Sequence, residues 1–279
     1  MNIKEALDFG KKYLNEKNID DSTLKCKVVL SEILSVQKEF LIIHDLQELN
    51  KKQETKYKEF LVRLADNEPL QYIINRQEFM KLNFFVDNNV LIPQPDTEIL
   101  VEKIIEISKN INKKLKILDL CTGSGAIAIS LDKNINNCEI YASDISKEAL
   151  NIAKLNAKNN EVQINLIESD LFENIHEYDF DIIVSNPPYI KSEIIDLLDE
   201  EVKKEPMLAL DGGKDGLNFY RILADKSREF LEKDGILAVE IGYNQKEEVI
   251  KLFKDKGFAE VYSKKDFGNN DRIVVGKWR

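Results

Sequence analysis

Apolar residues recur at helical spacing through roughly the first 70 positions of the chain. The segments Ile3–Leu14, Leu24–Leu34 and Phe60–Leu64 each place apolar side chains on one helix face. No charged cluster in this region has a catalytic pattern. We therefore predict an N-terminal helical domain, residues 1–72, that serves recognition or packing.

The pattern changes after Gln71. Tyr72-Ile73-Ile74 and Phe84-Phe85-Val86 are β-prone runs separated by polar residues, which predicts a hairpin linker over residues 73–95. Pro93 and Pro95 then interrupt the chain, and Asp96 or Thr97 is a candidate cap for the helix that follows.

From Lys116 onward, short apolar runs typical of buried strands alternate with helical stretches. The expected strands are 117–120, 139–142, 165–167, 181–184 and 236–241, with a last β pair near 261 and 273–275. The expected helices are 126–131, 146–159, 217–231 and 245–256. This alternation predicts an α/β domain, residues 96–279, with a doubly wound, mostly parallel sheet. The antiparallel-looking last pair is typical of the methyltransferase variant of that fold.

Composition narrows the class of protein. Hydrophobic residues make up 43% and charged residues 32%, as in ordinary globular chains, and no apolar run approaches the length of a membrane span. The three cysteines and two histidines form no metal-binding pattern, so we expect no metal. We expect a cytoplasmic protein that does not interact with membranes, and a monomer by default. The net charge of −10 argues against general or stable nucleic-acid binding.

A glycine loop follows the first predicted strand of the sheet. Asp119-Leu120-Cys121-Thr122-Gly123-Ser124-Gly125 joins this strand to a helix, and its glycines allow a tight turn beside a ligand. The spacing departs from a dinucleotide-binding loop and suits S-adenosyl-L-methionine, which has no phosphate. Asp144 ends the next strand, where a carboxylate can accept the ribose hydroxyls. Asp170 follows the strand after that and can accept from the adenine amino group.

The tetrapeptide Asn186-Pro187-Pro188-Tyr189 directly follows another apolar strand. Ligands of open α/β sheets bind beyond such strand ends. The Asn186 side-chain oxygen and the Pro187 carbonyl can accept the two N–H bonds of a planar NH2 group. The prolines stiffen the loop, and Tyr189 offers a flat face. We predict methyl transfer to a planar amide or amino nitrogen, with Asn186, Pro187 and Tyr189 as catalytic residues.

These motifs together resemble the PrmC (HemK) family, the protein-(glutamine-N5) methyltransferases that modify peptide chain release factors. The resemblance covers nearly the whole chain. Besides the Asn-Pro-Pro-Tyr loop, it rests on the segments 68–73, 91–98, 205–210 and 266–268 with 271–272. Two positions depart from the family pattern: Cys121 replaces a usual glycine, and Gln94 stands where arginine is common.

The resemblance implies a seven-stranded class I, Rossmann-like methyltransferase with a helical domain that docks the release factor. Its substrate is the glutamine of a Gly-Gly-Gln motif, and its cofactor is S-adenosyl-L-methionine, which becomes S-adenosyl-L-homocysteine. The substrate contacts implied are Asn186, Pro187, Pro188 and Tyr189. The cofactor contacts implied are Cys121, Thr122, Gly123, Ser124, Gly125, Asp144, Asp170, Leu171 and Asn186.

Two other hypotheses about the function stay open. An Asn-Pro-Pro-Tyr loop also suits a nucleic-acid amino-methyltransferase acting on adenine N6, because adenine presents an NH2 group on a planar ring. The acidic net charge and the absence of an evident basic insert disfavour this alternative. The other is a cofactor-binding protein that associates with the translation machinery without catalysis. The intact substrate loop argues against it.

Overall fold

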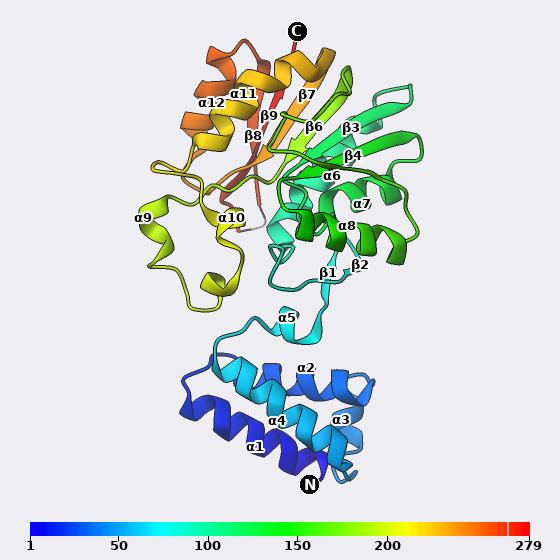
Figure 1. Cartoon of the computed structure of the whole chain (residues 1–279), viewed down its shortest axis with the longest axis vertical. Helices are drawn as coiled ribbons and strands as arrows, with labels where there is room; N and C mark the ends of the chain where they lie inside the picture. The colour runs from blue at the N-terminus through cyan, green and yellow to red at the C-terminus, as the bar shows by residue number, and fades with distance from the viewer. Residues whose placement is uncertain (267) are drawn as a thin grey trace. The chain divides into compact units, whose positions relative to one another are not determined.

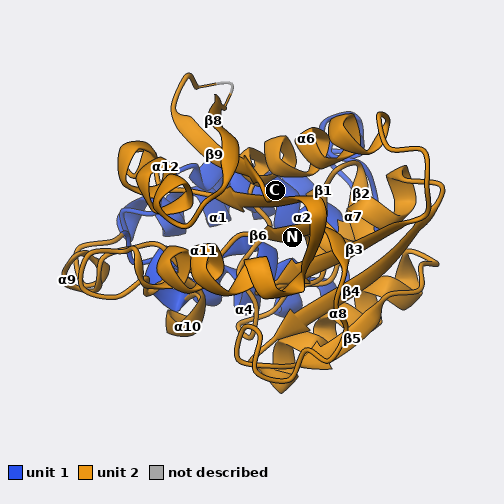
Figure 2. Cartoon of the chain, turned by 90° about the horizontal axis from the view of Figure 1, so that it is seen from above, with its two compact units in different colours: residues 1–76, 199–204 blue, residues 77–198, 205–279 orange. Residues whose placement is uncertain are grey.

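The chain forms two compact units (Figure 2). The computed structural model describes residues 1–266 and 268–279. Unit 1 comprises Met1–Arg76 and Asp199–Lys204, and unit 2 comprises Gln77–Leu198 and Glu205–Arg279. Phe267, which belongs to one of the segments that carry the resemblance, lies outside the described residues.

Unit 1 is helical, as its apolar spacing predicts. Leu14, Leu30, Tyr57 and Leu61 are buried in its core, which the helices share. Two of these helices start with a side-chain cap, and in each the backbone N–H of the cap residue donates in return to the side chain of the third helical residue. The elements are α1 (Ile3–Glu16), α2 (Ser22–Leu34), α3 (Phe40–Ile43), α4 (Lys51–Ala65), α5 (Leu70–Ile74) and the short η2 (Val202–Lys204).

The segment that we expected as the first strand of a hairpin is helical instead. Tyr72–Ile74 forms the end of α5, which follows Pro69 and stops at Asn75 with φ of 51°. Tyr72 and Ile73 are buried, so the packing of their side chains overrides their β propensity. The strand interpretation of Tyr72–Ile74 is therefore wrong.

The hairpin lies a few residues later, between β1 (Gln77–Phe79) and β2 (Leu82–Phe84). Its two turn residues, Met80 and Lys81, both have positive φ, at 50° and 62°. Asn-Gly is the pair that adopts such a turn most readily. Met-Lys carries no turn signal, which is why the sequence pattern misplaced the strands.

Unit 2 is built on a seven-stranded sheet with the order β5-β4-β3-β6-β7-β9-β8. The strands are β3 (Leu115–Leu120), β4 (Cys138–Asp144), β5 (Asn165–Glu168), β6 (Phe180–Ser185), β7 (Leu231–Glu240), β8 (Ala259–Lys265) and β9 (Asp271–Lys277). β9 is antiparallel to both of its neighbours, and the remaining neighbours are paired in parallel (Figure 1). The predicted doubly wound, mostly parallel sheet is confirmed.

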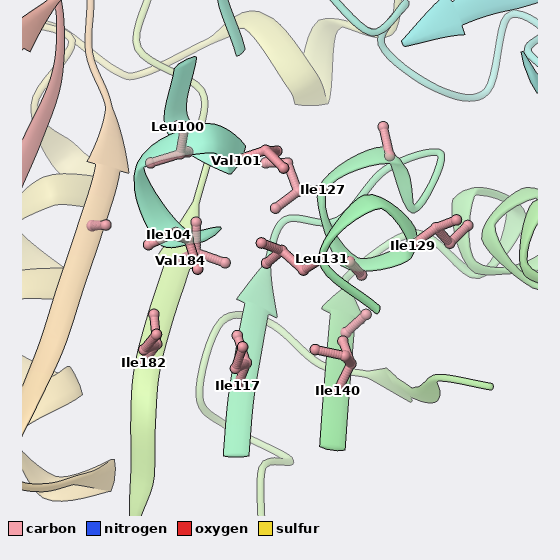
Figure 3. Close-up of a cluster of buried hydrophobic side chains, with 14 of the residues drawn as sticks. Leu100, Val101, Ile104, Ile117, Ile127, Ile129, Leu131, Ile140, Ile182 and Val184 are labelled. Carbon is pink, nitrogen blue, oxygen red and sulfur yellow. The ribbon is translucent and has the colours of Figure 1, made fainter. Parts of the chain in front are cut away.

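Helices cover both faces of this sheet, because successive strand residues point to opposite sides. On one face Ile117 and Ile182 pack with Ile104 of α6 and Leu131 of α7 (Figure 3). The elements outside the sheet are η1 (Pro95–Thr97), α6 (Glu98–Ser108), α7 (Ala126–Asn134), α8 (Lys147–Asn159), α9 (Ser192–Ile195), α10 (Met207–Leu210), α11 (Asn218–Phe230) and α12 (Lys246–Asp255).

On the other face of the sheet, Leu118 and Leu237 pack with Tyr220 of α11 and Phe253 of α12. Within the sheet, β3 lies between β4 and β6. Strands β4 and β5 were added on one side of β3 and β6 and β7 on the other, so the strand order reverses at β3. A crevice forms beyond the strand ends at such a reversal. The loops after β3, β4, β5 and β6 therefore meet at one edge. None of the helices among the described residues combines the length and the apolar character needed to cross a membrane.

Candidate active site

A cavity of about 270 Å³ lies where the loops after β3, β4, β5 and β6 meet. Six of the residues predicted to contact the cofactor line it: Cys121, Gly123, Asp144, Asp170, Leu171 and Asn186. Pro188 of the Asn186–Tyr189 loop lines it as well. The glycine loop after β3 and the Asn186–Tyr189 loop thus share one cavity.

Thr122, Ser124 and Gly125 support the cavity without lining it. Gly125 has φ of 80°, and a Cβ there would lie 3.1 Å from the Cβ of Ala153 on α8. The carbonyl of Ser124 accepts a hydrogen bond from buried Asn156 at 2.9 Å. Gly123 differs, because a Cβ at that position would meet open space. Glycine at 123 therefore leaves room that a side chain would take from a ligand.

Asp119, at the end of β3, holds the glycine loop in place. Its Oδ2 accepts hydrogen bonds from Thr122 Oγ1 at 2.6 Å and from the Ala128 backbone N–H at 3.2 Å. Burial raises the pKa of Asp119 to about 7, against the lowering effect of these two bonds. Asp119 thus closes the turn between β3 and α7.

Cys121 stands in the left-handed backbone region with φ of 60°. A glycine reaches this conformation without the steric cost that a Cβ brings. Burial also raises the pKa of the Cys121 thiol, and the charges of Asp144, Asp119 and Asp170 raise it further. The thiol is therefore neutral, so Cys121 lines the cavity without adding a charge.

Asp144, the last residue of β4, presents its carboxylate beside the glycine loop. Oδ2 accepts from the Gly123 backbone N–H at 2.8 Å, and Oδ1 accepts from the Ser146 backbone N–H at 2.9 Å. Burial raises its pKa, and hydrogen bonds from the backbone of Ser146, Gly123 and Ile145 lower it. Each oxygen keeps a further acceptor position, which suits a pair of hydroxyl groups.

Asp170 and Leu171 reach the cavity from the turn after β5. Leu171 has φ of 46°, and its carbonyl accepts a hydrogen bond from the Ser169 hydroxyl at 2.9 Å. Ser169 Oγ in turn accepts from the Asn174 backbone N–H at 2.9 Å. These bonds fix a turn that places an exposed carboxylate beside an apolar side chain on the cavity wall.

The Asn186–Tyr189 loop divides its residues between the cavity and the core. Asn186 and Pro188 line the cavity, Pro187 is buried, and Tyr189 packs against the hydrophobic core with α11 and α12. The Tyr189 carbonyl accepts from Gln245 Nε2 at 3.0 Å. The structure does not bring the Tyr189 ring to the cavity wall.

Two polar residues behind Asn186, Thr97 and Glu240, were not among the site residues predicted from sequence. Thr97 Oγ1 donates to Glu240 Oε2 at 2.6 Å, and Asn186 Nδ2 donates to Thr97 Oγ1 at 3.3 Å. Of the two candidate caps, Asp96 and Thr97, it is Thr97 that occupies the N-cap position of α6, but its side chain makes no capping hydrogen bond. Burial raises the pKa of Glu240 to about 7, against lowering contributions from Thr97, Arg272 and Asn186.

Arg272 of β9 completes this polar cluster. It forms ion pairs at 3.0 Å with both Asp96 and Asp266. Its charge lowers the pKa values of Glu240 and Tyr189, although burial raises both. Gln94, which replaces a usual arginine two residues before Asp96, is exposed and donates to the Ile92 carbonyl at 3.0 Å.

Apolar residues of the cavity wall were also missed. Some lie in the segments 91–98 and 205–210, which carry the resemblance but were given no site residues, and the others lie outside every motif: Val90, Leu91, Ile145, Ala149, Pro206, Leu208, Ala209 and Phe219. Glu205 Oε2 accepts from the Ile92 backbone N–H at 2.9 Å and thereby joins two of these segments. A cavity with carboxylates at two strand ends and apolar walls between them suits a nucleoside, whose hydroxyls donate and whose base is flat.

Two family models match the chain. The model of the PrmC N-terminal domain matches residues 5–74, and the model of the methyltransferase small domain matches residues 94–204. A release factor glutamine methyltransferase from Clostridium acetobutylicum is 38% identical over 280 residues, covering 99% of this chain and 98% of that protein. One from Geobacter sulfurreducens is 36% identical over 276 residues, covering 99% and 96%.

Among solved structures, a methyltransferase from Pyrococcus furiosus matches with a TM-score of 0.53. The match covers 70% of this chain and 88% of that one, at 19% sequence identity. At this identity the likeness concerns the fold alone, and it agrees with the sheet of unit 2.

Proposed function

The chain belongs to the release factor glutamine methyltransferase family, and we propose that it methylates the glutamine of the Gly-Gly-Gln motif in peptide chain release factors. The methyl acceptor is the side-chain amide nitrogen N5, and the donor is S-adenosyl-L-methionine. The observation that carries this proposal is the shared cavity, in which the strand-end carboxylates and the Asn186–Pro188 loop meet.

The residues present fit this cofactor. Asp144 offers acceptor positions to the ribose hydroxyls, and Asp170 offers one to the adenine amino group. The open space at Gly123 leaves room for the ligand beside the loop, and Leu171 contributes an apolar wall. When bound, S-adenosyl-L-methionine supplies a methyl group on a sulfonium, which is a good electrophile.

The substrate loop supplies positioning rather than a strong base. An amide nitrogen is a poor nucleophile, because its lone pair is delocalised into the carbonyl. Asn186 Oδ1 and the Pro187 carbonyl accept the two N–H bonds, which orients the nitrogen and raises its electron density. Holding the reacting atoms in line substantially lowers the activation free energy of the transfer. The nitrogen loses a proton during or after the transfer.

Labelled methyl transfer tests the proposal. The purified protein is incubated with S-adenosyl-L-methionine carrying a labelled methyl group and a release factor from the same organism. We expect label on the release factor and none on a variant of it whose Gly-Gly-Gln glutamine is replaced by alanine. Label on DNA or RNA, with none on the release factor, would favour the adenine-type alternative, because the same loop accepts an aromatic amino group.

A further inference from the structure

A short chain of polar side chains lies behind Asn186. Thr97 stands at the start of α6, Glu240 ends β7, and Asn186 follows β6, the strand paired with β7. Thr97 is 5% exposed and Glu240 is 2% exposed, so their polar atoms depend on partners within the protein. The hydrogen bonds run from Asn186 to Thr97 and from Thr97 to Glu240.

The chemistry of these groups determines which of them donates and which accepts in each hydrogen bond. An ionised carboxylate only accepts hydrogen bonds, so the single hydroxyl proton of Thr97 is committed to Glu240. The Thr97 oxygen can then only accept from Asn186, which it does from Nδ2. Because a carboxamide carries its nitrogen and oxygen at opposite ends, Oδ1 is left for a partner outside this chain of bonds.

We propose that Thr97 and Glu240 are positioning residues that hold the Asn186 carboxamide with its oxygen facing the substrate. This inference rests on the proposed function. Without them, the carboxamide can turn over and present N–H donors to the N–H donors of the incoming glutamine. With them, the loop presents an acceptor only, which selects a substrate that donates from an NH2 group.

The position of Thr97 supports a role beyond helix formation. It occupies the capping position of α6, yet its side chain makes no capping hydrogen bond there. The hydroxyl points instead to a buried carboxylate on another element, 143 residues away in sequence. Placing a carboxylate in the core costs free energy unless it is paired. Glu240 has no part in the substrate or cofactor contacts proposed above.

The charge of Glu240 gives the inference a pH dependence. Among the described residues, Arg272, Asp96 and Tyr189 interact with it by charge, and the Tyr220 hydroxyl donates to the Glu240 carbonyl at 2.9 Å. Burial raises the Glu240 pKa to about 7. Below that pH the protonated carboxyl can donate to Thr97, so the fixed direction is lost. Activity therefore rises with pH through about 7.

Replacement of Thr97 tests the role of these hydrogen bonds directly. Thr97→Val keeps the shape of the side chain and removes the hydroxyl, whereas Thr97→Ser keeps the hydroxyl. We expect kcat for release factor methylation to fall about tenfold or more in Thr97→Val, the loss expected for a hydrogen bond to a charged group. Cofactor affinity should change little, and Thr97→Ser should retain most of the activity. Thr55→Val, on an exposed face of α4, is the matched control.

Glu240→Gln supplies a readout that a purely structural role would not change. Its amide has no charge at any pH, so the fall of kcat below about pH 7 should disappear, and kcat at pH 8 should be lower than in the wild type. Glu247→Gln, at an exposed glutamate of α12, should keep the wild-type profile.

Three results overturn the inference. One is a Thr97→Val variant with wild-type kcat. Another is a Glu240→Gln variant that keeps the wild-type pH profile, which decides the matter even where Thr97→Val fails to fold. The third is a wild-type protein that binds the cofactor and leaves the release factor unlabelled, which removes the proposed function as well. In the first two cases the wild type methylates the release factor, so the proposed function stands.

Discussion

Cys121 adopts a left-handed backbone conformation in the loop that closes the cavity. In the family that the chain resembles, a glycine usually stands at this position of the loop. The sequence does not reveal whether the backbone changes to suit a side chain. The structure answers this, because Cys121 has φ of 60°, in the region that glycine favours, and still lines the cavity.

Cys121→Gly should relieve this backbone strain. The relief is worth about 1–2 kcal/mol, partly offset by the greater freedom of glycine in the unfolded chain, so we expect the free energy of unfolding to rise by up to about 1 kcal/mol. Urea unfolding of both proteins measures the change. A clear loss of stability would show that the Cys121 side chain contributes more by packing than its conformation costs.

Asn186 is the side chain that we propose contacts the substrate. Asn186→Ala removes the side-chain acceptor, and we expect kcat for release factor methylation to fall at least about a hundredfold, because the amide is no longer positioned. Stability and cofactor affinity should change much less. Asn110→Ala, at an exposed asparagine after α6, serves as the matched control. Near-normal turnover in Asn186→Ala would exclude the proposed role of this side chain.

The Asn186–Tyr189 loop is held in place by two neighbouring segments, around Gly212 and around Gln245. Gln245 Nε2 donates to the carbonyls of Tyr189 and Gly216, at 3.0 and 3.1 Å. Gly212 lies so close that an added Cβ would stand 2.7 Å from the Tyr189 Cα and 2.9 Å from the Pro188 carbonyl oxygen. These contacts fix the backbone of the loop.

Gly212→Ala should therefore displace the substrate loop. Both near contacts are backbone atoms, which cannot turn aside as a flexible side chain would. We expect kcat to fall at least about tenfold, because a shift of about 1 Å suffices for losses of that order. Cofactor binding, measured by calorimetry, should be less affected, since Gly212 does not line the cavity. An unchanged kcat would mean that the loop tolerates displacement.

The order of the elements was readable from sequence because unit 2 alternates buried strands with helices, each with its own apolar period. The ends of successive parallel strands meet at one edge, so the sequence pattern alone places Asp144, Asp170 and Asn186 together. The Thr97–Glu240 contact could not be predicted, since it is a side-chain hydrogen bond between residues that are 143 positions apart in the chain. The Met80-Lys81 turn was missed for a local reason, because neither residue favours positive φ.

In the whole molecule, the cavity that brings the predicted site residues together lies at the carboxyl edge of one sheet. The net charge of −10 disfavours partners that bind through phosphate contacts. A protein substrate suits this charge better than a nucleic acid does. The helical unit has its own core and its own family match, over residues 5–74, so it is a separate structural module. Docking of the release factor by this unit stays a prediction.

Methyl transfer to one glutamine side chain can be measured by tandem mass spectrometry of a release factor after incubation with the protein and S-adenosyl-L-methionine. We expect one added methyl group on the side-chain nitrogen of the Gly-Gly-Gln glutamine, and none when the Asn186→Ala variant is used. A release factor that stays unmodified, or carries the methyl group on another residue, would exclude the proposed function.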